Sequence, residues 1–230
     1  MTLTTLAGIV AEVRSLINET TAAFWSDAEI GSWINEAQEE IGHETFCLRT
    51  YKTYTILADD IFDEREFRMD SDFIAIDEGL VYYNDVACYP TTMARLVREN
   101  DEWRSGTGTP ARYYIRGDML GFDNKISAGD TVKFYQIERA TTLAASLAPF
   151  NGDYRLINFR KLLRDYAVSM AWYKKGEDTK GDRWWARYLK GLEDMKMLLN
   201  IDIDNSYQMI PEDHPAKFYP REHFPEWGQS

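Results

Sequence analysis

The chain has 230 residues and a formal net charge of −12, with 44% hydrophobic and 28% charged residues. This composition is typical of a globular protein and argues against intrinsic disorder. The acidic surplus disfavours binding to nucleic-acid phosphates and to anionic membranes, because both require Lys and Arg. No apolar run approaches the ~20 residues that span a bilayer. Residues 1–13 lack a basic segment followed by an unbroken apolar run, so we expect no secretory signal.

Two helices are predicted near the start of the chain. Aliphatic residues at helical spacing indicate the first helix, over residues 3–19. Ser26 and Glu29 have the spacing of a capping box, in which each side chain accepts a hydrogen bond from the other residue's backbone N–H. This motif predicts that a second helix covers residues 27–46, so residues 1–47 are interpreted as an N-terminal helix pair.

Residues 48–152 have the composition of strands and turns, since Tyr, Phe, Ile, Val and Thr alternate with Asp, Asn and Gly. Asn84-Asp85 and Gly117-Asp118 each separate two apolar runs, which is typical of hairpins. Residues 92–103 have mixed spacing and suit a short helix. We therefore expect an inserted antiparallel β region with strands near 51–57, 65–69, 73–76, 80–83, 86–89, 112–116, 119–122 and 131–137.

Helical spacing returns after Gly152 and predicts a C-terminal helix pair over residues 153–200. Trp184 and Trp185 are adjacent in the last of these helices, and adjacent helical positions point about 100° apart. Both rings therefore cannot face one core. We expect one in the core and the other either at a subunit interface or beneath the β region.

Residues 201–230 differ from the rest of the chain. They contain four of the seven prolines, which excludes a helix interior or a central strand. A plain disordered tail would lack aromatic residues. We therefore predict an extended arm that binds a partner through its five aromatic anchors. These anchors are Tyr207, Phe218, Tyr219, Phe224 and Trp227.

The order of elements predicts an α+β protein in which the two helix pairs pack together as one bundle around the inserted β region. Residues 1–50 contain 2 basic and 8 acidic residues, a net charge of −6. Residues 153–200 contain 11 basic and 7 acidic residues, a net charge of +4. Opposite patches on one protomer suit a head-to-tail contact between copies in a ring. The basic helices could also face acidic neighbours within the same chain. An equally good interpretation is that solvated faces simply differ in charge.

Catalytic and metal-binding motifs are weak. The chain has three histidines and no phosphate-binding loop, nucleophile elbow or paired-cysteine motif. Cys47 and Cys88 are interpreted as buried apolar thiols in a reducing compartment. We therefore expect neither a cofactor nor enzymatic activity. An enzyme remains the competing class of protein. Its acid–base groups would be the carboxylates of Asp59, Asp60, Asp63 and Glu64. A solvated connection between strands explains the presence of these acidic residues more simply.

One stretch near the C-terminus has partial calcium-loop spacing. Asp202, Asp204, Ser206 and Asp213 stand at the first, third, fifth and twelfth positions of such a loop. Tyr207 occupies the position that requires glycine, and an aspartate stands where a glutamate is usual. We therefore predict no metal site.

Three stretches of the chain resemble the head-to-tail adaptor proteins, also called connector or neck proteins, of tailed bacteriophages. The first is Trp-Ser-Asp-Ala-Glu-Ile at 25–30 followed by Asn-Glu-Ala-Gln at 35–38. The second is Trp103 with Gly-Thr-Gly-Thr-Pro at 106–110 before an aromatic strand. The third is Arg-Asp-Tyr-Ala at 164–167, then Gly-Glu-Asp at 176–178. The order and spacing of these pieces carry the resemblance, which spans most of residues 1–200.

The resemblance implies a virion structural protein of the neck, between head and tail, which assembles in the host cytoplasm. Such proteins form a ring, commonly of twelve copies, beneath the portal protein. The ring extends the channel through which genomic DNA passes without specific binding, and it is the platform for a tail, nozzle or other neck protein. In several members the C-terminal arm docks onto the portal, which suits residues 201–230. The alternative is a tail-completion or other neck or assembly protein without direct portal binding.

Overall fold

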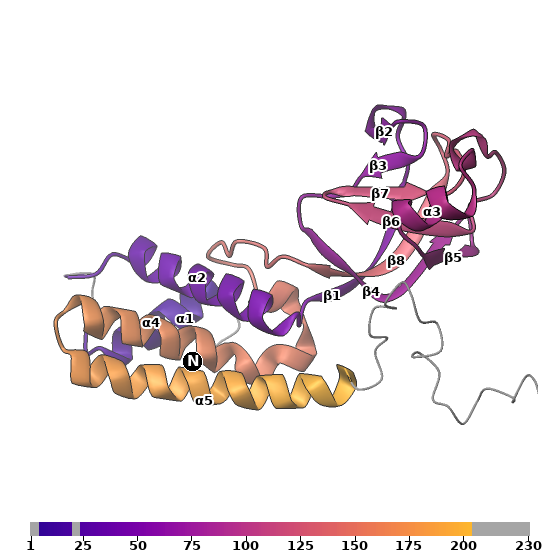
Figure 1. The fold of residues 1–230 in the computed structure, drawn as a ribbon. Coiled ribbons are helices and arrows are strands. Elements are labelled where there is room, and N and C mark those ends of the chain that lie inside the picture. Colours follow the sequence, from indigo (N-terminus) through magenta and orange to yellow (C-terminus); the bar gives the residue numbers. More distant parts are fainter. Residues whose placement is uncertain (1–4, 20–23, 204–230) are drawn as a thin grey trace, which may run out of the picture. The chain divides into compact units, whose positions relative to one another are not determined.

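The computed structural model describes residues 5–19 and 24–203 (Figure 1). The chain divides into two compact units. The helical unit contains the described residues up to Leu48 and from Glu138 onward, and the β unit is Arg49–Ile137. The presence of both helices and a sheet confirms the α+β class. Residues 138–152, which we expected within the β region, lie in the helical unit.

Four long helices form the helical unit: α1 (Leu6–Leu16), α2 (Asp27–Thr45), α4 (Arg160–Lys174) and α5 (Asp178–Ile203). Two 3₁₀ segments, η3 (Phe150–Gly152) and η4 (Tyr154–Phe159), precede α4. All four helices contribute to one apolar core. Helix α4 contacts each of the other three and buries nine of its 15 residues, so it is the central helix of the unit.

Helix α2 begins where the capping box predicts. The Ser26 hydroxyl accepts a hydrogen bond from the Glu29 N–H at 3.1 Å, while the Glu29 carboxylate forms an ion pair with Lys174. Ile30, Ile34 and Ile41 recur at helical spacing and are fully buried. The helix ends at Phe46, which has a left-handed backbone with φ of 49°.

Two polar side chains of α2 hold the segment that follows the sheet. The Asn35 side chain accepts a hydrogen bond from the Leu143 N–H at 2.7 Å. Gln38, which is 1% exposed, accepts from the Phe150 N–H at 2.7 Å and donates to the Thr141 carbonyl at 2.9 Å. These bonds satisfy backbone groups that burial would otherwise leave unpaired. They explain why an Asn and a Gln stand on this helix.

The β unit contains an eight-stranded sheet with the order β1-β8-β4-β5-β6-β7-β3-β2. Its connections include η1 (Ala58–Asp60), α3 (Met93–Glu99) and η2 (Trp103–Ser105). The two runs predicted at 73–76 and 80–83 form the single strand β4. The strands are β1 (Arg49–Thr55), β2 (Ile61–Phe62), β3 (Glu66–Arg68), β4 (Phe73–Tyr83), β5 (Val86–Pro90), β6 (Arg112–Arg116), β7 (Met119–Phe122) and β8 (Thr131–Glu138).

The expectation of a purely antiparallel sheet is wrong at one pair. Strands β5 and β6 are parallel, with Tyr89 opposite Arg112 and Pro90 opposite Tyr113. Between them the chain passes through α3 and η2 before it re-enters the sheet. A crossover of this length returns the chain in its original direction, whereas a tight turn reverses it.

Both predicted hairpins are present. Asn84 and Asp85 join β4 to β5 with positive φ angles of 44° and 68°. Two successive positive φ angles match the twist of the flanking strands. Gly117 and Asp118 join β6 to β7 in the same two-residue register. The core of the β unit contains the aromatic residues Phe67, Phe122 and Phe134, each at most 2% exposed.

Candidate functional site

The arm anchors Tyr207, Phe218, Tyr219, Phe224 and Trp227 lie outside the described residues, as does the calcium-like spacing beyond Ile203. The candidate site that the structure describes is therefore the surface of the helical unit. It contains the predicted interface residues Trp184 and Trp185, both on α5 and both partly buried against the apolar core.

The two tryptophans have different surroundings. The Trp185 ring lies with its centroid 5.7 Å from that of Tyr166 and 5.2 Å from that of Tyr188, within an aromatic cluster. The Trp184 ring instead carries the guanidinium of Arg187, 4.3 Å from its centroid. A cation over an aromatic face is a stabilising contact that leaves both groups at the surface. Trp184 is thus the tryptophan associated with a surface charge.

Arg187 belongs to a charge network that crosses three helices. It lies 3.7 Å from Asp165 of α4, a carboxylate residue only 4% exposed. Arg164 also pairs with Asp165 at 2.7 Å and reaches Glu12 of α1 at 3.2 Å. Two guanidiniums around one buried carboxylate compensate its loss of hydration. The network ties the edge of α5 that carries Trp184 to α4, and it ties α4 to α1.

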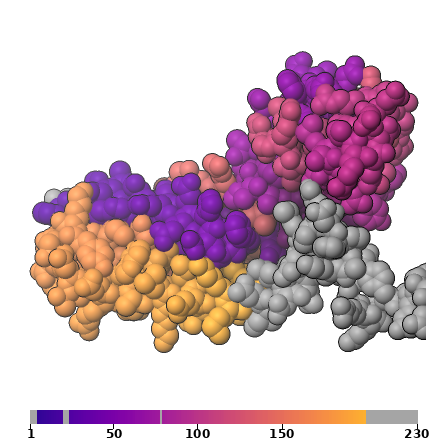
Figure 2. All heavy atoms as spheres, viewed as in Figure 1, coloured from indigo at the N-terminus to yellow at the C-terminus, as the bar shows by residue number. Residues whose placement is uncertain are grey.

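Helix α2 has six acidic residues and no Lys or Arg. Several of its carboxylates pair with basic or hydroxyl groups of α4 and α5. Besides Glu29 with Lys174, Glu44 accepts from Lys196 at 2.6 Å and Glu40 accepts from the Tyr188 hydroxyl at 3.0 Å. The hydrogen bond from Lys196 lowers the pKa of Glu44. Figure 2 shows the indigo atoms of α1 and α2 beside the orange and yellow atoms of α4 and α5.

Part of the charge difference seen in the sequence is therefore satisfied within one chain. Glu36 and Glu39 of α2 are exposed. Burial raises the pKa of Tyr166, and the nearby negative charge of Glu36 raises it further, which places Glu36 beside the aromatic cluster. Among the basic residues, Lys161 is exposed one turn before Asp165. Glu39 and Lys161 are thus available for contacts between molecules, whereas Glu36 also interacts with the Tyr166 hydroxyl.

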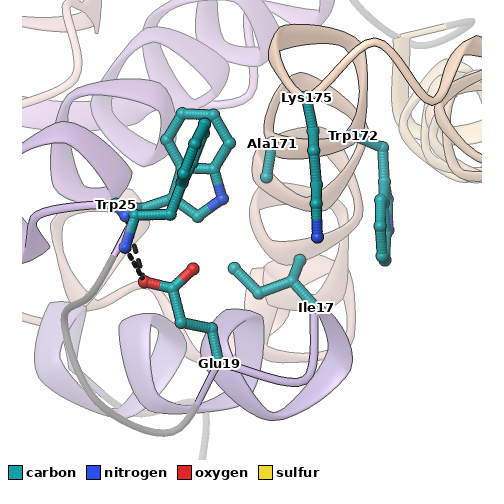
Figure 3. Close-up of a pocket in the computed structure, with 7 residues that line it drawn as sticks. Ile17, Glu19, Trp25, Ala171, Trp172 and Lys175 are labelled. Atoms are coloured by element: carbon teal, nitrogen blue, oxygen red, sulfur yellow. Dashed lines mark hydrogen bonds between the residues drawn. The ribbon is translucent and has the colours of Figure 1, made fainter.

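A small pocket lies between the α1–α2 connection and α4, lined by Ile17, Glu19, Phe24, Trp25, Ala171, Trp172 and Lys175 (Figure 3). Glu19 accepts hydrogen bonds from the N–H groups of Phe24 and Trp25 at 2.8 and 3.0 Å. The Lys175 ammonium lies 5.3 Å from the Trp172 ring centroid. Both charged groups are thus used in local contacts, and the pocket presents no nucleophile beside a base.

Two of the four carboxylates considered as acid–base groups, those of Asp63 and Glu64, form ion pairs with basic side chains. Asp63 pairs with Arg104 at 3.0 Å, and Glu64 pairs with Lys125, which lowers the pKa of Glu64. Asp59 and Asp60 lie in η1. Within residues 5–19 and 24–203, no group of three His, Cys, Asp or Glu side chains is placed to hold a metal ion. Cys47 and Cys88 are buried thiols, as predicted.

A model of the family described as "SU10 adaptor protein" matches residues 4–210 of the chain. The chain belongs to the SU10 adaptor protein family. No curated protein matches it. Membership identifies a phage adaptor-type structural protein that is associated with the virion and interacts with other virion proteins. The matched region covers every described helix and strand.

The adaptor's charge network contains residues that the sequence analysis did not single out as site residues. Trp184 and Arg187 are three positions apart, a spacing that places their side chains together on a helix. That local signal was available. Glu12 and Arg164 are 152 positions apart, and no local pattern pairs them.

Among the helices of the described residues, none combines the length and the apolar character needed to cross a bilayer.

Proposed function

We propose that this adaptor is a ring-forming head-to-tail adaptor of the virion neck, built into the particle in the host cytoplasm. It docks beneath the portal, extends the DNA channel and provides the platform for the next tail or neck protein. The observation that carries the proposal is the family match over residues 4–210.

Charge supports a channel role. Each copy has a net charge of −12, so a ring of twelve copies would carry about −144. An acidic lining repels phosphate groups, and DNA then slides through without sticking to the wall. DNA would be a passing partner and not a ligand.

The helical unit is the proposed ring-building part, with the N- and C-terminal helix pairs acting as one bundle. A core shared by four helices gives a rigid body on which an interface can be preformed. We also propose that the protein performs no catalytic step. The engaged carboxylates around Asp63 and Glu64 support this proposal.

Portal attachment is assigned to residues 201–230. Mass photometry or native mass spectrometry should detect a smaller species for the protein alone and the addition of about twelve copies when the cognate portal is present. If no copy adds to an intact portal, the portal role is wrong and a tail-side or other neck role takes its place.

The arm itself is tested by truncation and by matched substitutions. Residues 1–200 should fold, because the helical core and the sheet have their own apolar faces, and they should lose portal binding. Replacing the five arm aromatics by alanine should have the same effect on binding. A control with Glu212, Asp213 and Glu222 changed to Gln or Asn keeps the aromatics and should bind. Loss of binding in the control alone would assign attachment to charge instead.

A further inference from the structure

We propose that the helical unit joins copies head to tail. The edge of α5 that carries Trp184 and Arg187 in one copy binds the exposed carboxylates of Glu36 and Glu39 on α2 of the next copy. The binding partner of each surface is thus a second copy of this chain. The inference rests on the proposed ring and specifies the two surfaces that build it.

The two surfaces lie on different sides of the helical unit. Lys196 faces α2, where it pairs with Glu44. Arg187 precedes it by nine residues, which is about two and a half helical turns, so Arg187 lies on the opposite side of α5. There it contacts Asp165 of α4. On α2 the stripe Ile30, Ile34 and Ile41 faces the core, and Glu36 and Glu39 lie outside that stripe. Surfaces on different sides are what a head-to-tail contact requires, whereas a two-fold dimer uses one surface twice.

The two surfaces have complementary chemistry. Helix α2 carries no Lys or Arg, and its exposed residues Glu36 and Glu39 give it a negative face. The Trp184–Arg187 edge carries Arg187, whose side chain is 57% exposed, and the exposed Lys161 lies one turn from Asp165 on the adjoining face of α4. Complementary charge aligns two copies, and a partly exposed tryptophan supplies the apolar anchor that such contacts use.

The charge network explains why this edge suits assembly. Arg187 is held by Asp165 on one side and by the Trp184 ring on the other. A side chain that is already ordered loses little further conformational freedom on binding. Trp185 is excluded as the anchor because it packs within the aromatic cluster of Tyr166 and Tyr188.

Disulfide cross-linking of the full chain tests the head-to-tail geometry. On oxidation, the double variant Glu39→Cys/Arg187→Cys should form a ladder of disulfide-linked oligomers. This result is expected in two preparations, the free protein at high concentration and the portal-bound assembly. Each single variant should give no ladder, because its cysteine has no partner cysteine opposite. Cys47 and Cys88 are 2% and 0% exposed and should not contribute. In these variants Asp165 keeps Arg164 as an ion-pair partner, which lies 2.7 Å away in the wild-type chain, so the fold should persist. Absence of a ladder in both preparations would overturn the inference.

Charge exchange provides a second, independent measurement. Glu39→Lys and Arg187→Glu should each weaken association by about tenfold or more, and the chain carrying both should recover it. Arg68→Glu, a reversal at an exposed arginine of the β unit, is the control and should assemble normally. If the wild-type chain adds to the portal as a ring and both reversals assemble equally well, the inference fails while the proposed function stands. If the wild-type chain adds no copies to the portal, the proposed function itself fails.

Discussion

The helical unit and the β unit differ in how far apart in the sequence the residues of each core lie. The helical unit joins the two ends of the described chain, as the contact between Arg164 and Glu12 across 152 positions illustrates. The β unit closes within the continuous segment 49–137, where Tyr54 reaches Gln136 across only 82 positions. Closing a longer loop costs more chain entropy. The β unit therefore has all its parts early in the chain, and the helical unit needs the last helix.

Both units combine exposed ion pairs with a buried carboxylate. The helical unit sets acidic α2 against basic α4 and α5 through side chains that are mostly exposed, such as Lys174 and Glu44. Its buried carboxylate is that of Asp165, which is 4% exposed and pairs with Arg164 and Arg187. In the β unit, Glu66 is 1% exposed and accepts from the Tyr114 hydroxyl at 2.9 Å and from Arg116 at 2.7 Å. Exposed pairs contribute little to stability, whereas buried groups are costly to leave unpaired. The buried carboxylates of Asp165 and Glu66 thus help to hold the two folds, whereas the exposed charges are the ones suited to assembly.

The largest expected effect comes from replacing one large buried side chain by alanine in each core separately. Leu163→Ala in α4 should destabilise the helical unit by about 2–5 kcal/mol, and Phe134→Ala in β8 should destabilise the β unit by about 3–5 kcal/mol. Both residues are at most 1% exposed. Hydrogen exchange should report each loss within its own unit. Leu189→Ala, at a leucine 42% exposed, is the control and should change little. Equal losses in both units from either core variant would show that the units unfold as one.

Gly121→Ala should test the close packing of the β unit. A Cβ atom at this position would lie 2.3 Å from the Tyr114 ring, which is held in the sheet, so we expect a loss of about 1–3 kcal/mol. Gly191→Ala in α5 is the comparison, because its Cβ would meet the tip of the flexible Leu162 side chain. The helical propensity of alanine, about 1 kcal/mol better than glycine, should offset much of that clash. Chemical denaturation of the two variants measures the difference. A larger loss for Gly191→Ala would contradict this account.

Glu66→Gln should weaken the β unit by about 1–3 kcal/mol, because the exchange leaves a buried hydrogen-bond network without its charge. Glu64→Gln is the matched control, since the Glu64 side chain is 69% exposed. Urea titration followed by tyrosine fluorescence compares the two. Equal stability of both variants would mean that burial of Glu66 has no energetic consequence.

The smallest expected effect is a pH response at Glu99. Hydrogen bonds from Arg95 and Arg112 lower the pKa of Glu99 from 4.5 to about 2. Because the folded pKa is depressed, the stabilisation is present above pH 4.5 and is lost as pH falls toward 2. An NMR titration of the carboxylate measures this directly. Arg95→Gln should raise the Glu99 pKa, and an unchanged pKa would assign the shift to Arg112 alone.

Local patterns in the sequence were enough to predict much of the secondary structure. The capping box at Ser26, the apolar stripe of α2 and the two-residue turns at 84–85 and 117–118 are interactions among residues a few positions apart. Their physics is contained in a short window of sequence. The family resemblance likewise came from short stretches, although some of their residues, such as Gln38 and Arg164, make contacts across more than a hundred positions.

Only the tertiary structure decided which distant residues meet. It made β5 and β6 parallel, placed residues 138–152 with the helices through Asn35 and Gln38, and packed Trp185 against Tyr166 of α4. It also joined Glu12, Arg164, Asp165 and Arg187 into one network. Each of these outcomes depends on contacts across tens to more than a hundred positions. Such contacts depend on how whole helices and strands pack together. A short window of sequence does not contain the residues that form them.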